Sequence, residues 1–375
     1  MYSQPSCIYE YAHAVTHAAL YVVDISGDKG NVGLVMASFT IGALIMRVIA
    51  GWLVDNYGRK KIMLWGMVAA VVVVSFYRLA TNIPLMLLVR ALHGMAFGMI
   101  STAASTMVAD ILPTARMGEG MGYFGLTTAL AMALAPMTGV WLVETSSYTT
   151  MFITISVLAV VALFCGLPVR GTNGVVANAA PDTIGEVLAG LLEKKAALPS
   201  VVMCSLAILN GAIIPFVALY AVERGVANVG LFFTANAVLT LLSRPIAGRM
   251  TDRGRTDLVL LIGHLSLFVC VVVLGLANTL TEFIIAGAFF GWGFGFVMPT
   301  LQALAVRYVA PHRRGAATGT FFIAFDLGLG VGNIFFGFLA EALSYQIMFF
   351  ITLIPLIIAA VIYYLYRPRP SVENC

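Results

Sequence analysis

Three titratable side chains lie close together near the N-terminus, in a segment that also carries many apolar residues. Glu10, His13 and His17 are spaced at i, i+3 and i+7, so they share one face of a helix. A carboxylate and two imidazoles on one face could bind a proton, hold a transition metal or contact a metal-chelating substrate. This is the most polar of the long apolar segments, and an alternative is that these residues are an accident of where the sequence starts.

Three further ionisable residues lie deep in long apolar segments. Arg90 and His93 share one segment, and Asp326 lies in another. A charge at membrane depth is costly unless it meets water or a partner, so each residue is a candidate functional group. Arg90 could alternatively snorkel to the membrane surface. Asp326 could pair with Arg244 or with basic loop residues, or it could form a structural hydrogen bond, because glycines surround it.

The composition places these residues in a membrane protein. Of 375 residues, 61% are hydrophobic and 10% are charged, and the mean hydropathy is +0.97. A soluble domain carries about a quarter charged residues, which excludes an ordinary soluble fold. The net charge of +4 lies in short loops and reports membrane orientation, not nucleic-acid binding. Five cysteines without paired spacing predict neither a disulfide nor a metal site, and we expect no cofactor.

Apolar segments of membrane length predict an all-α protein with twelve spanning helices. In chain order they cover residues 5–23, 32–53, 62–80, 83–109, 118–143, 149–169, 201–222, 229–250, 258–277, 283–306, 315–339 and 347–366. The one long hydrophilic connection carries apolar residues at helical spacing from Ile184 to Leu192. This spacing favours a short helix on the membrane surface, and a flexible linker is the alternative.

The two halves of the chain repeat one another. The sequence Asn-Val-Gly-Leu begins at Asn31 and again at Asn228, an offset of 228 − 31 = 197, and Asp55 recurs as Asp252 with 252 − 55 = 197. A register held over several segments indicates duplication in the same orientation. We therefore expect two pseudo-symmetric six-helix bundles. The expected division is residues 1–169 for the first bundle, 170–200 for a cytosolic linker and 201–375 for the second bundle.

The second apolar segment ends in Gly51-Trp-Leu-Val-Asp55-Asn-Tyr-Gly58-Arg59-Lys60-Lys61. Three consecutive cations mark the cytosolic end of a membrane helix, and Gly58 permits a tight turn. The stretch matches the pattern G-x-L-x-D-x-x-G-R-[KR] at every defined position. The chain therefore resembles transporters of the major facilitator superfamily, and it looks like the drug or metabolite carriers of that family that exchange their substrate for protons.

The resemblance implies a gate at the cytosolic membrane face. Asp55 would cap the eleventh helix near Gly315 while Asp110 meets Arg59, so that one bundle holds the other. The second copy of the pattern is less complete, which predicts one strong and one weak clasp. The gate residues are Gly51, Asp55, Gly58, Arg59, Lys60, Asp110, Gly248 and Asp252.

The resemblance also bears on proton coupling. Arg90 resembles the arginine of an R-x-x-Q-G motif that the family associates with proton coupling in exporters, with His93 in place of the glutamine. The fifth segment carries Gly122, Pro136 and Gly139 at positions of the exporter signature, although alanine or valine replaces other glycines of that signature. A small-residue helix with a proline suits a bent, tightly packed seal against proton leak, and ordinary membrane packing is the alternative.

Loop charges predict the orientation. Basic residues gather at one end of the expected helices, and most loop acids lie at the other. Both termini are therefore expected in the cytosol, in a multi-pass protein of the cell inner (cytoplasmic) membrane.

Taken together, these features predict a secondary active transporter and not an enzyme. It would move a small organic solute outward by alternating access, in exchange for protons. The expected partners are a small-molecule substrate, protons and the lipid bilayer, with the protein a monomer that binds no nucleic acid. One alternative is an importer of a sugar or metabolite, by proton symport or facilitation. Others are an intramembrane metalloenzyme and a truncated, inactive carrier.

Overall fold

The computed structural model describes residues 30–169, 171 and 191–367 of the chain. Within these ranges the protein is helical and has no strands. The helices are α2 (Gly30–Tyr57), α3 (Arg59–Ser75), α4 (Ile83–Ile111), α5 (Met117–Thr145), α6 (Tyr148–Gly166), α8 (Ala197–Glu223), α9 (Gly230–Asp252), α10 (Thr256–Leu276), α11 (Leu280–Arg307), α12 (Arg314–Ala342), α13 (Tyr345–Ile351) and α14 (Leu353–Tyr366).

Ten stretches among the described residues are long and apolar enough to cross a membrane. One of them, Tyr345–Tyr366, combines α13 and α14. The helix α5, with 29 residues, coincides with the predicted fifth span. The predicted first span, with Glu10, His13 and His17, lies outside the described residues, and so does the predicted surface helix from Ile184 to Leu192 apart from its last two residues.

Local sequence signals set several helix ends. The side chains of Asn82 and Ser147 accept hydrogen bonds from backbone N–H groups in the first turns of α4 and α6, at 2.9 and 3.2 Å. Thr279 and Glu282 form a reciprocal capping box at the start of α11. Gly58 separates α2 from α3 with φ +94°, a conformation that suits glycine.

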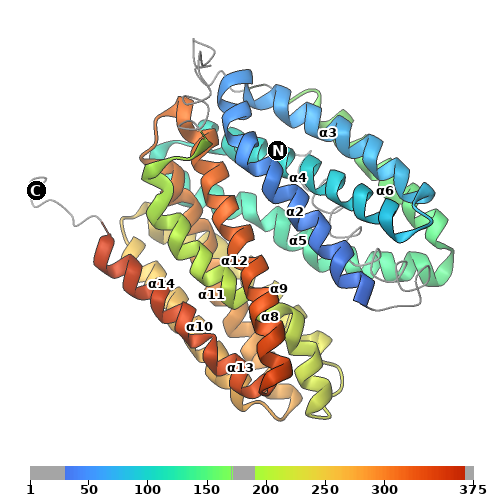
Figure 1. Ribbon diagram of the computed structural model, residues 1–375. Coiled ribbons are helices and arrows are strands. Elements are labelled where there is room, and N and C mark those ends of the chain that lie inside the picture. The colour runs from blue at the N-terminus through green and yellow to red at the C-terminus, as the bar shows by residue number, and fades with distance from the viewer. Residues whose placement is uncertain (1–29, 170, 172–190, 368–375) are drawn as a thin grey trace, which may run out of the picture.

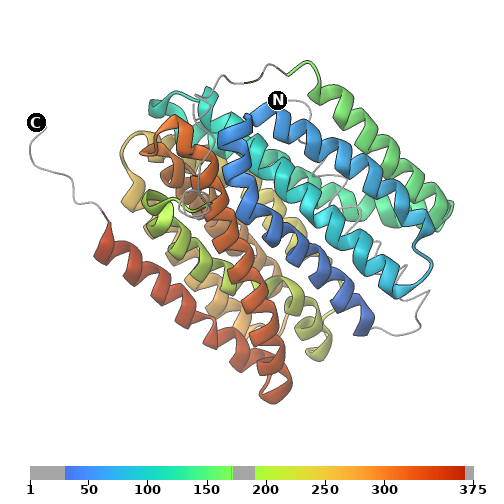
Figure 2. The same cartoon turned by 45° about the horizontal axis from the view of Figure 1, so that its top comes forward.

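The helices form two groups, which we call the N-terminal bundle (α2 to α6) and the C-terminal bundle (α8 to α14). Within the first, α2 packs along α4, and within the second, α9 packs along α11. Between the bundles, α2 lies beside α12 and α5 lies beside α9. The first of these contacts is seen between the blue and the orange-red helix (Figure 1, Figure 2). Under the sequence repeat, α2 corresponds to α9 and α5 corresponds to α12, so the two contacts between the bundles are equivalent.

Close helix contacts in the two bundles follow the 197-residue repeat. A Cβ added to Gly94 would lie 2.0 Å from the carbonyl oxygen of Phe39, and one added to Gly291 would lie 2.2 Å from that of Asn236. The offsets 291 − 94 and 236 − 39 are both 197. Glycine is needed at both sites because the neighbouring backbone leaves no room for a side chain.

Large apolar side chains on the outer faces of the helices are exposed. Along α2, Ile41, Ile45 and Ile49 recur every four residues and are 55%, 53% and 43% exposed. Such a continuous apolar stripe fits contact with lipid tails. The exposed stripe and the interior between the bundles are therefore separate surfaces, and the latches and the buried ion pair described next lie on the second.

Candidate functional site

Asp55, at the C-terminal end of α2, binds the first turn of α12. Its Oδ1 and Oδ2 atoms accept hydrogen bonds from the backbone N–H groups of Gly315 and Ala316, at 2.9 and 2.8 Å. Asp55 is only 4% exposed. The free N–H groups and the positive end of a helix dipole both favour a carboxylate at this position. We call this contact between the bundles the first latch.

A cluster of charges surrounds the first latch. Arg59 donates from Nε to Oδ2 of Asp110 at 2.9 Å and also bonds the carbonyl oxygen of Pro311. Arg314, on α12, reaches Oδ1 of the same Asp110 at 3.2 Å. Asp110 therefore links guanidinium groups from both bundles, and Asp55 lies 3.3 Å from Arg59. The pairing of Asp110 with Arg59, which the resemblance implied, is present in the structure.

A second latch lies at the same end of the molecule and joins α9 to α5. Asp252, which ends α9, accepts hydrogen bonds from the backbone N–H groups of Gly118 and Glu119, both at 2.8 Å. These residues form the first turn of α5. Arg249 donates to the Glu119 carboxylate at 2.8 Å and to the Tyr123 hydroxyl at 2.9 Å.

The two latches are related by the sequence repeat. Adding 197 to Asp55 gives Asp252, and subtracting 197 from Gly315 gives Gly118. Gly51 and Gly248 take equivalent places, since a Cβ on either would lie 2.7 or 2.5 Å from the carbonyl oxygen of the facing glycine.

The predicted contrast between a strong and a weak clasp does not extend to the capping bonds, whose lengths agree within 0.1 Å. The contrast lies in the charges around them. Arg59 is buried, whereas the side chain of Arg249 is 56% exposed. Ion pairs that face solvent contribute little, so the second latch depends mainly on its two backbone bonds. We refer to the end of the molecule that holds both latches as the latch end.

Farther into the molecule, a buried ion pair joins α2 to α12. Arg47 bonds the carboxylate of Asp326 and donates to the carbonyl oxygen of Phe322 at 3.3 Å. Its guanidinium also lies 4.7 Å from the centre of the Phe322 ring and 3.4 Å from the Ser101 hydroxyl. Arg47 and Asp326 are 4% and 8% exposed. The prediction that Asp326 pairs with Arg244 is therefore wrong. Asp326 lies on α12, which packs against α2 with Arg47, whereas Arg244 occupies the equivalent position on α9.

A neutral contact also crosses between the bundles. The side-chain amide of Gln302 on α11 donates to the Ser105 hydroxyl on α4 at 2.8 Å, and both residues are buried. Their separation is 302 − 105 = 197, so each residue is the repeat equivalent of the other. A contact of a residue with its own equivalent places this pair at the pseudo-symmetry axis.

Arg90 and His93 lie together inside the N-terminal bundle. Arg90 donates to the Tyr77 hydroxyl at 3.3 Å, and this hydroxyl shares a hydrogen bond with Nδ1 of His93 at 3.0 Å. Phe39 lies under the guanidinium of Arg90 at 5.2 Å. Arg90 is 0% exposed, so it does not snorkel to the surface.

The remaining predicted residues occupy the following places. Gly122 faces α9, where an added Cβ would lie 2.7 Å from the carbonyl oxygen of Arg244. Lys60 donates to the carbonyl oxygen of Leu167 at 2.9 Å and lies apart from the latch hydrogen bonds. Pro136 and Gly139 belong to α5, at positions whose side chains lie outside the described part.

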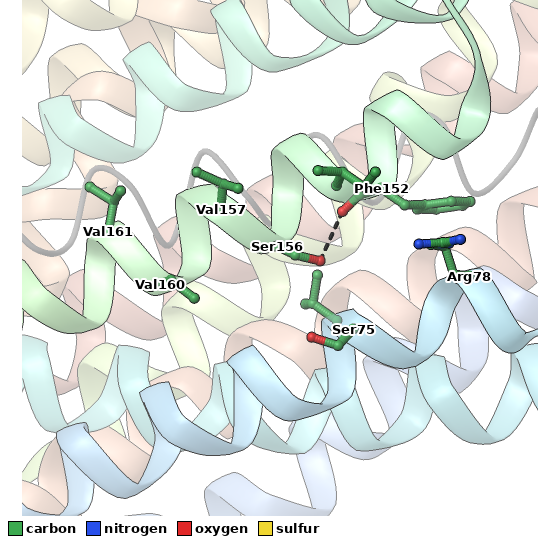
Figure 3. A pocket seen from close by; sticks show the side chains of 9 residues that line it. Ser75, Arg78, Phe152, Ser156, Val157, Val160 and Val161 are labelled. Carbon is green, nitrogen blue, oxygen red and sulfur yellow. Dashed lines mark hydrogen bonds between the residues drawn. The ribbon is translucent and has the colours of Figure 1, made fainter.

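A shallow groove of about 390 Å³ lies on the outer face of the N-terminal bundle, between α3 and α6. Val157, Val160 and Val161 give it an apolar floor, and Arg78 lies beside Phe152 at one end (Figure 3). The groove faces away from the bundle interface and shares no residue with the latches. We therefore do not regard it as the transport site.

The arrangement of two repeated bundles with paired latches can be compared with known proteins. The family model of the Major Facilitator Superfamily matches residues 10–225 and 199–374. The chain belongs to this superfamily. Members of the Major Facilitator Superfamily are transporters, and the protein is accordingly a multi-pass membrane transporter and not an enzyme.

Three relatives extend the comparison. An uncharacterized MFS-type transporter of Methanocaldococcus jannaschii is 23% identical over 94% of this chain and 92% of its own. The staphylopine export protein of Staphylococcus aureus is also 23% identical, over 92% and 90%. The multidrug resistance protein MdtG of Klebsiella pneumoniae is 26% identical over 73% and 68%. The chain is thus a superfamily transporter of the drug or metabolite type.

Solved structures agree with the fold. The human organic anion transporter MFSD10 superposes with a TM-score of 0.77 at 13% identity and covers 96% of both chains. The transporter FucP in its outward conformation gives a TM-score of 0.75 at 15% identity and covers 98% of both. These structures support the twelve-helix fold predicted from the sequence, of which the described residues hold all but the first span.

Sequence reasoning did not select Arg47, Ser105 or Gln302 as site residues. Arg47 carried a detectable signal, because it is a lone cation in an apolar segment of membrane length. Ser105 and Gln302 carried a weaker one, since small polar residues are common in membrane helices and only their equivalence in the repeat sets them apart.

Proposed function

We propose that this transporter exports a small organic solute by alternating access, in exchange for protons. The observation that carries the proposal is the pair of equivalent latches at one end of the molecule, which tie α2 to α12 and α9 to α5. With both latches formed, a solute between the bundles can leave only toward the opposite end. Breaking both latches would let the bundles rock and expose the same space at the latch end.

The charges of the loops support a cytosolic latch end. Basic residues follow or precede the latch-end termini of α2, α9, α12 and α14, and cations are retained on the cytosolic side of membrane proteins. The arrangement of latched bundles then corresponds to an outward-open state. Both chain termini would lie on the cytosolic side.

The Arg47–Asp326 pair supports proton coupling. It joins the bundles in the low-dielectric interior, where a charge without a partner is costly. Protonation of Asp326 would remove the attraction to Arg47 and weaken the contact between α2 and α12. A proton entering from the opposite end could in this way favour release of the latches, and its loss at the latch end would restore the pair. Arg90 and His93 lie within the N-terminal bundle and not between the bundles, and His93 is a second candidate for taking up a proton.

The relatives support outward transport. Their names describe an export protein and a multidrug resistance protein, and both cover most of this chain. The sugar or metabolite importer remains the competing proposal, since a related fold serves both directions.

Everted membrane vesicles test the proposal. Respiration acidifies their interior, and addition of an exported solute should partly collapse the pH gradient. Ethidium, Nile red and fluorescein would serve as cationic, neutral and anionic fluorescent solutes. We expect collapse with at least one of them, at a rate reduced at least about tenfold in Asp326→Asn, because loss of a buried charge partner costs about 3–5 kcal/mol.

Asp257→Asn is the matched control. Asp257 also pairs with an arginine, Arg367, but its side chain is 53% exposed and lies within the C-terminal bundle. Proton exchange should be nearly unchanged in this variant. Solute accumulation that dissipates no proton gradient, or that proceeds only in right-side-out vesicles, would reject proton-coupled export and favour the importer.

A further inference from the structure

Arg244 on α9 carries a partly covered guanidinium that has no partner among the residues that the structure describes. Its Nε and Nη1 atoms are covered, and neither has a hydrogen-bond partner in the structure. Among the residues that the structure describes, Arg244 also forms no ion pair. A guanidinium carries five N–H donors and keeps its charge, so leaving it unpaired inside a membrane protein is costly. Such a residue requires a functional explanation.

The repeat makes the missing partner specific. Arg244 is the equivalent of Arg47, since 244 − 197 = 47. Arg47 is neutralised by Asp326, whose equivalent is 326 − 197 = 129, and residue 129 is alanine. The second half of the chain therefore supplies a carboxylate to the arginine of the first half, and the first half supplies none at the equivalent position to Arg244.

Two other neighbours of Arg47 differ at the equivalent positions of the second half, whereas Phe97 recurs as Phe294. Phe322, which provides a carbonyl oxygen and a ring to Arg47, corresponds to Gly125, and Ser101 corresponds to Met298. The Nη1 atom of Arg244 lies only 2.4 Å from the position that a Cβ on Gly125 would take. The guanidinium thus lies against the backbone of α5 at Gly125, without the phenylalanine ring and the serine hydroxyl that Arg47 has.

Arg244 lies farther into the molecule than the second latch. It precedes Asp252 of the second latch by eight residues, which corresponds to about 12 Å along the helix. The side chain as a whole is half-buried, although Nε and Nη1 are covered. It lies where α5 and α9 face each other across the bundle interface, and these are the helices that the second latch joins.

We infer that Arg244 binds the carboxylate of an organic anion, which takes the place that Asp326 occupies beside Arg47. A carboxylate matches the paired N–H donors of a guanidinium and supplies the missing charge. Bound between α5 and α9, it would draw these helices together as the Arg47–Asp326 pair draws together α2 and α12. This inference rests on the proposed transport function and assigns its substrate class.

Binding to purified protein in lipid nanodiscs tests the inference. Benzoate, glutarate and citrate would each be compared with the corresponding amide, with thermal unfolding and equilibrium binding as readouts. At least one carboxylate should raise the unfolding temperature of the wild-type protein, while its amide does not. In Arg244→Gln, the affinity for that carboxylate should fall about 10- to 100-fold, the range expected for a charge-assisted hydrogen bond.

Two more variants separate binding from folding. Arg244→Lys keeps the charge but not the paired donors, so it should fold normally and bind with intermediate affinity. Ala129→Asp supplies an internal carboxylate at the position equivalent to Asp326. It should raise the unfolding temperature without ligand and abolish carboxylate binding.

The inference is overturned if no carboxylate stabilises the wild-type protein, or if the stabilisation persists in Arg244→Gln. It is also overturned if chloride or phosphate at equal concentration reproduces the shift, because the site would then bind any small anion. Proton exchange with ethidium but no carboxylate binding would reject the substrate class and keep the proposed function. Carboxylate binding through Arg244 without any solute exchange would keep the binding site and reject the proposed function.

Discussion

At the scale of single residues, Asp55 and Asp252 perform the same contact in different surroundings. Each accepts two backbone hydrogen bonds from the first turn of a helix in the other bundle. Asp55 is buried beside the charges of Arg59 and Asp110, whereas Asp252 is more accessible. A carboxylate at a helix N-terminus contributes through both its hydrogen bonds and its charge, and the charge counts most where water is excluded.

We predict that Asp55→Asn opens the first latch and leaves the second in place. The amide keeps one acceptor and loses the charge, which should cost about 1–2 kcal/mol. Hydrogen exchange at the Gly315 and Ala316 amides should then accelerate about 5- to 30-fold. The matched variant Asp252→Asn should accelerate exchange at Gly118 and Glu119 instead. Equal acceleration at both sites in either variant would mean that the latches do not open separately.

Sequence reasoning reached some of these contacts and missed others for identifiable reasons. The contact of Asp55 with the start of α12 and the pairing of Asp110 with Arg59 were implied by the resemblance to the superfamily, and a carboxylate suits a helix N-terminus. The partner of Asp326 did not follow, because the repeat offers two equivalent arginines, Arg47 and Arg244, and residue type cannot choose between them. Only the pairing of α2 with α12 decides this.

At the scale of elements, the helices end close to where apolar segments and capping residues predict. The predicted fourth span, 83–109, corresponds to α4 at Ile83–Ile111. The predicted twelfth span is divided at Thr352 into α13 and α14, because Pro355 cannot donate a hydrogen bond to residue 351. Prolines within α8, α9 and α11 leave those helices continuous, so a proline alone did not identify the break.

The close contact of α2 with α12 leads to a prediction about Gly51. In Gly51→Val, the new side chain would meet the Gly315 carbonyl oxygen, since even a Cβ would lie 2.7 Å from it. Overpacking of about 1–3 kcal/mol should shift the population toward a state with the latch end open. Spin labels at Tyr57 and His312, both exposed at the latch end, should report longer distances.

Gly330→Val is the control for this experiment. Gly330 also lies inside a helix, but nothing lies within 4 Å of a Cβ added there. The label distances should stay as in the wild-type protein. If both valine variants lengthen the distances equally, the effect comes from altered helix stability and not from the contact between α2 and α12.

At the scale of the whole molecule, the two halves have equivalent helix contacts but different buried charges. The latches, the close contacts at glycines and the Ser105–Gln302 pair all obey the 197-residue offset. The buried carboxylate of Asp326 has no equivalent in the other half. A symmetric scaffold can rock between two equivalent openings, whereas an asymmetric charge distribution can assign one half to internal neutralisation and the other to a ligand.

Rocking has a direction only if the latch end faces a known side of the membrane, and this leads to the last prediction. The positive-inside rule places the exposed Lys61 of the latch end in the cytosol and the exposed Asn278, at the opposite end, outside. The variants Lys61→Cys and Asn278→Cys would be made after replacement of the five native cysteines by alanine. A membrane-impermeant maleimide should label Asn278→Cys in intact cells and Lys61→Cys only in everted vesicles. The reverse pattern would make the latches an outer gate, so that the latched state would open to the cytosol and the proposed direction of transport would no longer follow from it.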